Sequence, residues 1–144
     1  MTDTPRRVAV PRARSWARRY AMQALYQWQM TGQDLGLIDA QFFAEEDMSK
    51  ADVGYFQELL HQVLRQTPTL NDSLTPFLDR PPEQIDPVER AILWIAVYEL
   101  LFRPDLPYRV VINEAVELAK KFGAEQSHRF INGVLDKVSR GLRG

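Results

Sequence analysis

Apolar residues recur every three or four positions along most of the chain, and no convincing stretch alternates between apolar and polar residues. Such spacing places apolar side chains on one face of a helix, whereas alternation would indicate a strand. The sequence therefore predicts an all-α fold with about six to seven helices. The expected ranges are about 13–30, 34–44, 49–66, 68–78, 87–103, 109–122 and 125–140.

The clearest boundary signals lie around the helix expected at 87–103. Asp86 followed by Pro87 combines a capping side chain with a first-turn proline. The helix itself is apolar on nearly every side, which is typical of a helix in the middle of a bundle. Just upstream, residues 79–82 interrupt the helical pattern with two prolines, and we place a subdomain boundary there. We therefore expect a flexible arm at 1–12, an N-terminal helical subdomain at 13–80 and a C-terminal one at 81–144.

Other helix ends carry weaker signals. Ser49 and Asp52 resemble a capping pair that opens the third helix. Gly123 is a natural C-terminal stop for the helix at 109–122. Within that helix, Glu117 and Lys121 are expected to pair one turn apart.

Positive charge is concentrated at the N-terminus. Only Asp3 opposes six arginines within the first nineteen positions, although the net charge of the whole chain is −1. Guanidinium groups pair bidentately with phosphate and stack on bases, which lysine does not do. We interpret the segment as a nucleic-acid-binding arm, and the alternative is a solvated tail that aids solubility. The arginines are Arg6, Arg7, Arg12, Arg14, Arg18 and Arg19.

Residue types that carry catalysis are sparse. The chain has no cysteine, and His61 and His128 have no second histidine at metal-ligand spacing. None of the seven glycines belongs to a phosphate-binding loop. We therefore expect no catalytic residue, no metal site and no cofactor. The most apolar stretch, 88–102, contains two charged residues and is too short to span a bilayer, so we expect no membrane association.

A second basic patch is predicted at the turn between the last two helices. Lys120, Lys121, His128 and Arg129 gather there, and Phe130 stands beside them, one position off the apolar stripe of its helix. An aromatic ring beside cations is a candidate for stacking on an unpaired base. Ordinary core packing is the alternative for Phe130.

Two more positions have a functional and a structural interpretation. Tyr26 on the first helix is either a core-edge residue or a stacking and hydrogen-bonding surface. Glu89 and Arg90 are charged residues at the start of a helix that is otherwise apolar. There Glu89 either favours the helix dipole or helps to define a protein-docking face.

Six stretches of the sequence carry a recognisable pattern, and they are 21–28 (AMQALYQW), 90–93 (RAIL), 98–100 (YEL), 105–108 (DLPY), 112–123 (INEAVELAKKFG) and 127–137 (SHRFINGVLDK). The most specific segments lie in the C-terminal half. Together these stretches resemble the NusB family of bacterial transcription antitermination factors, and the resemblance covers nearly the whole chain from about Arg14 onward.

The resemblance implies two three-helix subdomains joined by a connecting helix. It also implies binding of boxA RNA together with NusE, a ribosomal small-subunit protein, and read-through by the RNA polymerase elongation complex with other Nus factors, notably in ribosomal RNA operons. The implied partner contact is Glu89, and Arg90 would share its face. The implied RNA contacts are Arg6, Arg7, Arg12, Arg14, Arg18, Arg19, Arg129 and Phe130; Tyr26 and Lys121 join them as candidates from the residue pattern.

The chain departs from the family pattern in its arm, which is longer. Ser15 and Trp16 stand where an uninterrupted arginine run is expected. An enzymatic alternative is a ribosomal RNA cytosine methyltransferase, because such enzymes carry a similar helical domain at their N-terminus. Such an enzyme also needs a cofactor-binding domain, and this chain has neither the length nor the glycine motif for one. A structural scaffold without an RNA role is a third interpretation. We expect a cytoplasmic protein, and a homodimer that hides the RNA surface stays possible.

Overall fold

The computed structural model describes residues 10–143, which fold into seven α-helices and three short 3-10 turns with no strand. The all-α prediction is confirmed. The turns are η1 (Met48–Lys50), η2 (Thr75–Phe77) and η3 (Pro82–Gln84). The helices are α1 (Val10–Thr31), α2 (Leu35–Glu45), α3 (Val53–Arg65), α4 (Thr67–Leu74), α5 (Pro87–Phe102), α6 (Tyr108–Phe122) and α7 (Ser127–Arg143).

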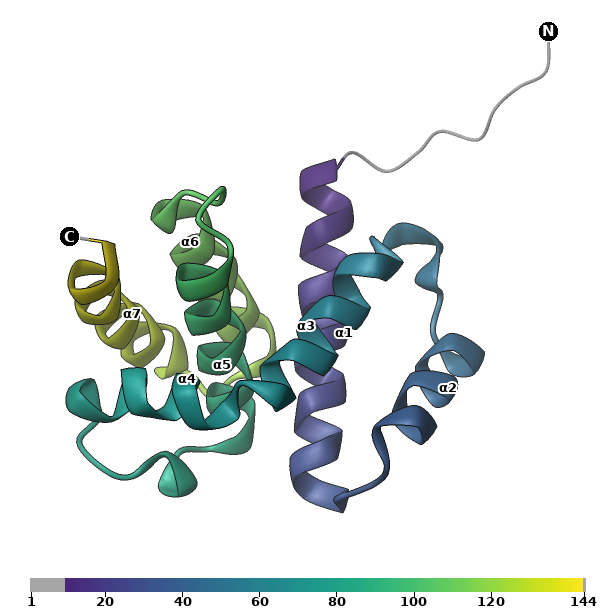
Figure 1. The fold of residues 1–144 in the computed structure, drawn as a ribbon, viewed down its shortest axis with the longest axis horizontal. Helices are drawn as coiled ribbons and strands as arrows, with labels where there is room; N and C mark the ends of the chain where they lie inside the picture. Colours follow the sequence, from purple (N-terminus) through teal and green to yellow (C-terminus); the bar gives the residue numbers. More distant parts are fainter. Residues whose placement is uncertain (1–9, 144) are drawn as a thin grey trace, which may run out of the picture.

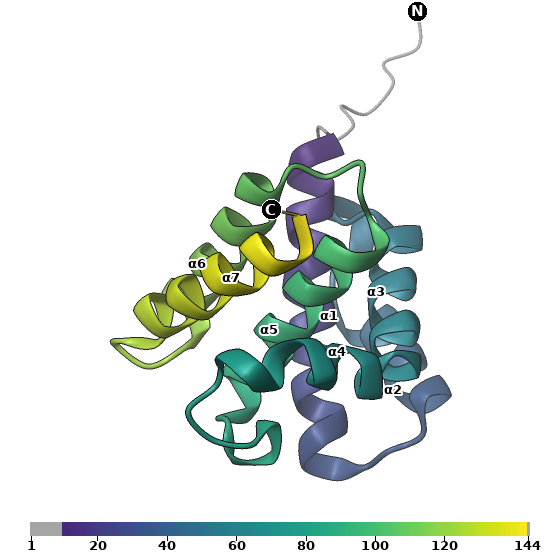
Figure 2. The ribbon, with the colours of Figure 1, turned by 60° about the vertical axis from the view of Figure 1, so that its left-hand side comes forward.

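Two groups of helices meet along α1 and α5. In Figure 1, α2 lies on one side of α1, α3 crosses α1, and α4, α6 and α7 lie on the other side. Figure 2 shows α6 and α7 side by side and next to α5. Helix α5 contacts α1, α3, α4, α6 and α7, so it forms the centre of the molecule. Because α1 and α4 both contact α5 across residue 80, the subdomain boundary there stays a prediction.

The central place of α5 follows from its sequence. Eleven of its residues are buried, from Glu89 to Leu100 with the single exception of Arg90. A helix that is apolar on all sides gains most when other helices cover it completely. At its start, the Asp86 carboxylate accepts hydrogen bonds from the backbone N–H groups of Val88 (3.1 Å) and Glu89 (3.2 Å), as the sequence predicts.

The third helix begins later than its predicted start. Its cap is Asp52 alone, whose carboxylate accepts a hydrogen bond from the Tyr55 N–H at 3.0 Å. The predicted capping pair of Ser49 and Asp52 is wrong, because Ser49 lies in η1 and its hydroxyl bonds to Asp47 instead. Lys50 and the extended residues Ala51 and Asp52 therefore separate Ser49 from the helix.

The start of the first helix also differs from the prediction. Helix α1 begins at Val10, so Arg12 belongs to the helix and not to a flexible arm. Arg6 and Arg7 lie outside the described residues. Since the helix has about 3.6 residues per turn, positions seven apart, such as Arg12 and Arg19, share a face, and positions four apart, such as Arg14 and Arg18, share another.

An ion pair in the protein interior joins α1 to α5. The Arg18 Nε donates to both carboxylate oxygens of Glu99, at 3.2 and 2.9 Å, and the two side chains are 3% and 1% exposed. The Tyr55 hydroxyl from α3 donates a short hydrogen bond to the same carboxylate. Arg18 also lies 3.5 Å from Glu114 of α6. Four helices therefore contribute to one buried polar cluster.

The pair is held under strong desolvation. Burial raises the pKa of Glu99, and the attraction of Arg18 and the Tyr55 hydrogen bond act against that rise. Burial also raises the pKa of the Tyr55 hydroxyl, and the adjacent Glu99 carboxylate raises it further. For Arg18, burial lowers the pKa, but Glu99, Tyr55 and Glu114 outweigh it and the net shift is upward. The guanidinium therefore stays charged in the core, and its neutralisation depends on Glu99.

Removing one partner of this pair should destabilise the protein strongly. We expect Arg18→Leu to lower the free energy of unfolding by about 3–5 kcal/mol, because it leaves the buried Glu99 carboxylate without its counter-ion. The double variant Arg18→Leu with Glu99→Leu should be more stable than either single variant. Urea unfolding followed by circular dichroism measures this. A single variant as stable as the native chain would contradict the assignment.

Candidate nucleic-acid interface

The arginines of α1 face two different surroundings. Arg12 is exposed, and Arg19 is partly buried on the same face of the helix. Arg14 is partly buried with its guanidinium 5.1 Å from the centre of the Tyr55 ring, and its Nε has no partner among the described residues. Arg12 and Arg19 therefore form the accessible part of the run, and Arg14 lies between surface and core.

The structure corrects the expectation for Arg18. The residue is 2% exposed and its guanidinium is bound to Glu99, so it has no surface to offer to a phosphate. A polyanion would reach it only after the ion pair with Glu99 had broken and α1 had moved from α5. Arg18 therefore acts as a core residue that positions the rest of α1.

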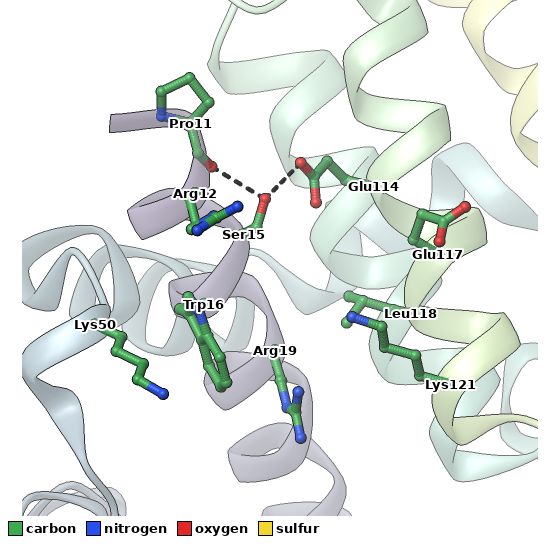
Figure 3. A pocket seen from close by; sticks show the side chains of 10 residues that line it. All are labelled: Pro11, Arg12, Ser15, Trp16, Arg19, Lys50, Glu114, Glu117, Leu118 and Lys121. Carbon is green, nitrogen blue, oxygen red and sulfur yellow. Dashed lines mark hydrogen bonds between the residues drawn. The ribbon is translucent and has the colours of Figure 1, made fainter. Parts of the chain in front are cut away.

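A cleft of about 590 Å³ lies beside Arg12 and Arg19, between α1, η1 and α6. Figure 3 shows Arg12 and Arg19 on the α1 side, Lys50 reaching toward Trp16 from η1, and Lys121 extending from α6 toward α1. The Ser15 hydroxyl donates to Glu114 across the cleft at 2.7 Å. The lining residues are Pro11, Arg12, Ser15, Trp16, Arg19, Lys50, Glu114, Glu117, Leu118 and Lys121.

Two members of this cleft were missed by the sequence reasoning. Trp16 interrupts the expected arginine run, yet its ring lies 4.8 Å from the Arg19 guanidinium and 5.2 Å from the Lys50 ammonium. Arg19 also lies 5.0 Å from the ring of Phe122 at the end of α6. Lys50 is a single cation in an acidic stretch. It reaches the cleft because η1 packs against α1. The spacing of Arg12, Ser15, Trp16 and Arg19 on one helical face was the signal available in the sequence.

Lys121 is exposed and takes part in the cleft without the predicted partner. The expected pair of Glu117 and Lys121 is wrong, since Glu117 lies 3.6 Å from Lys120 instead, one position earlier. No ion pair involves Lys121 among residues 10–143, which leaves its ammonium directed at the cleft. Gly123 ends α6 as predicted, and a Cβ there would lie 2.6 Å from Ser127, so the tight turn into α7 requires glycine.

The second predicted patch lies at the start of α7. Arg129 is exposed, and Phe130 is partly buried against the core. The guanidinium of Arg80 covers the Phe130 ring at 5.4 Å, a contact that the sequence analysis did not foresee because Arg80 belongs to the break before α5. Phe130 therefore packs against the core on its inner side and has the guanidinium of Arg80 over its ring. Tyr26, on the second half of α1, is 39% exposed.

The predicted partner-binding residues prove to be largely internal. Glu89 is only 9% exposed. Arg90 donates from Nη2 to the backbone carbonyls of Glu83 (2.8 Å) and Ile85 (2.9 Å), and its guanidinium lies 5.9 Å from the Trp94 ring. Arg90 thus holds η3 against α5. A partner protein could contact Glu89 and Arg90 only through the small part of each residue that is exposed.

Residues 10–143 contain neither a metal-ligand cluster nor a membrane-spanning helix. No group of three or more acidic, histidine or cysteine side chains there is placed to hold a metal ion. The His61 Nε2 lies 2.6 Å from the Asp39 carboxylate, and no hydrogen bond joins it to a second histidine among these residues. None of the described helices combines the length and apolar character needed to cross a bilayer.

Comparisons with known proteins decide the family. The NusB family model matches residues 15–140. The chain belongs to the NusB family. The transcription antitermination protein NusB of Alcanivorax borkumensis is 55% identical over 135 residues, which cover 94% of this chain and 90% of that protein. The family is one of transcription antitermination factors, so this chain is one of them.

Solved NusB structures share the fold. A crystal structure of antitermination factors NusB and NusE in complex with double-stranded RNA matches with a TM-score of 0.80 and 26% identity, covering 88% of this chain and 96% of that one. Thermotoga maritima NusB matches with a TM-score of 0.75 and 26% identity, covering 96% and 93%. The all-helical arrangement described above is therefore the NusB fold.

The internal role of Arg90 is testable. We expect Arg90→Ala to lower the free energy of unfolding by about 1–3 kcal/mol, because two carbonyls of the η3 segment lose a charged donor. The exposed Arg65→Ala should change it by less than about 0.5 kcal/mol. Urea titration compares the two variants. Unchanged stability of Arg90→Ala would free this side chain for a partner and overturn its structural role.

Proposed function

We propose that this protein is a non-catalytic RNA adaptor of the cytoplasm. It binds boxA RNA together with NusE and promotes read-through by the RNA polymerase elongation complex with other Nus factors, notably in ribosomal RNA operons. The observation that carries the proposal is the cleft at which exposed cations of α1, η1 and α6 meet beside an indole. Cations and aromatic rings in one groove suit single-stranded nucleic acid.

The cations of α1 supply affinity without sequence preference. Arg12, Arg19 and the half-buried Arg14 would neutralise phosphates, assisted by Arg6 and Arg7 upstream. Each neutralised phosphate of a single strand contributes about −0.7 to the slope of log affinity against log salt. Five arginines that each neutralise one phosphate therefore predict a slope of about −3.5. Preference for boxA must then come from base contacts and from NusE.

Base contacts are assigned to the aromatic edges beside these cations. Phe130, with Arg129 and Arg80, forms one stacking edge, and the exposed Tyr26 is a further hydrogen-bonding or stacking surface. Lys121 links the α1 cations to the start of α7, since α6 ends there. Glu89 would contribute its exposed edge to the NusE-docking face. A solved structure of NusB and NusE in complex with double-stranded RNA has the same fold as this chain. It supports the proposal that one protein and one RNA bind together.

The salt dependence tests the electrostatic part. We expect Arg12→Ala with Arg19→Ala to reduce the salt slope for boxA RNA by about 1.4, measured by filter binding with NusE present. Arg65→Ala with Arg140→Ala removes the same charge elsewhere and should leave the slope unchanged. A scrambled RNA separates boxA preference from general attraction. An unaltered slope in the first variant, or equal capture of both RNAs, would refute the proposal.

A stacking role for Phe130 predicts a separable defect. Phe130→Asp should weaken boxA RNA binding while helical circular dichroism and the unfolding midpoint are largely kept, because the ring is only partly buried. Phe130→Tyr keeps a ring and should bind RNA like the native chain. Loss of helical structure in Phe130→Asp, with normal RNA affinity per folded molecule, would instead establish a packing role.

A further inference from the structure

The walls of the cleft between α1, η1 and α6 differ in chemistry. On one side the Trp16 indole lies among cations, with Arg19 at 4.8 Å and Lys50 at 5.2 Å from its ring. On the other side α6 presents the Glu114 carboxylate, which is 26% exposed. A carboxylate repels a phosphate, so this lining suits a ligand that has an anionic end and a flat end with N–H donors.

The dimensions agree with such a ligand. The cleft measures about 590 Å³, within the range of about 300–1,000 Å³ that small-molecule sites occupy. It opens beside Arg12, which lies on the same face of α1 as Trp16 and Arg19. A strand that follows the α1 cations would therefore pass the mouth of the cleft.

We propose that this cleft receives one unpaired nucleotide of the bound RNA, with its base stacked on Trp16. The inference rests on the proposed function and deepens it, because it assigns a base-binding site within the basic surface of α1. Arg12, Lys50 and Lys121 hold the flanking phosphates. Trp16 supplies the stacking surface, because its indole lines the cleft.

The cations around the indole differ in their freedom to move. Arg19 lies between two rings, Trp16 at 4.8 Å and Phe122 at 5.0 Å, and is fixed by both. Lys50 is exposed, stands on a three-residue turn, and contacts the ring of Trp16 alone among the described rings. An arriving base displaces Lys50 from the indole, and its ammonium then meets the phosphate of the same nucleotide. Base–aromatic stacking replaces an exposed cation–π contact, which is the weaker of the two.

The α6 wall sets the identity of the base. Glu114 keeps one oxygen for Ser15 at 2.7 Å and faces the cleft from α6. A carboxylate accepts hydrogen bonds from the amino group of cytosine and from other amino-bearing bases. Uracil presents a carbonyl oxygen in that place and is repelled. The site therefore prefers an amino-bearing base.

The test measures boxA RNA affinity of the full chain with NusE by fluorescence anisotropy. Trp16→Leu should lower affinity by about 5- to 100-fold without changing the salt slope, since no charge is removed. Trp16→Phe keeps a ring and should lose less. Trp28→Leu, on the same helix but outside the cleft, is the matched control and should bind normally. Thermal unfolding of each variant shows that the comparison is made between folded proteins.

An abasic scan of the RNA then locates the nucleotide. At one position, removal of the base should weaken RNA binding by the native chain and leave RNA binding by Trp16→Leu unchanged. Uracil at that position should also weaken RNA binding by the native chain. No position whose effect depends on Trp16 would overturn the inference. Equal affinity of Trp16→Leu and the native chain would also overturn it, while the slope change of the Arg12 and Arg19 variant would leave the proposed function standing. Loss of NusE capture alone would reassign the cleft to protein docking.

Discussion

The arrangement of the whole surface depends on one buried contact, the ion pair of Arg18 with Glu99. It fixes the angle and rotation of α1 on α5, and through Tyr55 and Glu114 it connects α3 and α6 to the same point. A hydrophobic contact would tolerate a small rotation of α1, whereas a buried charge-assisted hydrogen bond restricts it because the bond has a preferred direction. Because α1 carries the accessible arginines, its rotation decides which of them reach solvent. The ion pair therefore contributes more to orientation than to net stability, since desolvation cancels much of its attraction.

The periodicity of the helix turns one arginine run into two functional sets. With Arg18 held inward, Arg14 one turn earlier lies above Tyr55, at the rim of the core. Arg12 and Arg19, seven positions apart, point to the other side and meet Lys50 and Lys121. The same spacing brings Trp16 to the cleft face. A cluster that looks uniform in sequence is thus divided by geometry into core, rim and surface.

The sequence predicted well what depends on local pattern. The apolar α5 and its Asp86 cap were predictable because periodicity and capping act within a few residues. The burial of Arg18 was not, because its counter-ion Glu99 is 81 residues away and only the packed fold brings the two together. Glu117 pairs with Lys120 and not Lys121 because helical spacing allows partners both three and four positions away, and the sequence does not choose between them. Arg80 over Phe130 likewise joins a loop to a helix that no local rule connects.

Glu114 shows how core and surface are linked. It receives the Ser15 hydroxyl on the cleft side and lies near Arg18 on the inner side, so a single carboxylate of α6 takes part in both. Arg18 has a second acid within reach, and the cleft gains a negative wall that keeps its cations from binding any anion indiscriminately. A purely basic groove would attract every polyanion, and its salt-dependent affinity would carry no discrimination between bases. Acids of α6 set among cations allow the same surface to attract a strand broadly and to accept a base selectively.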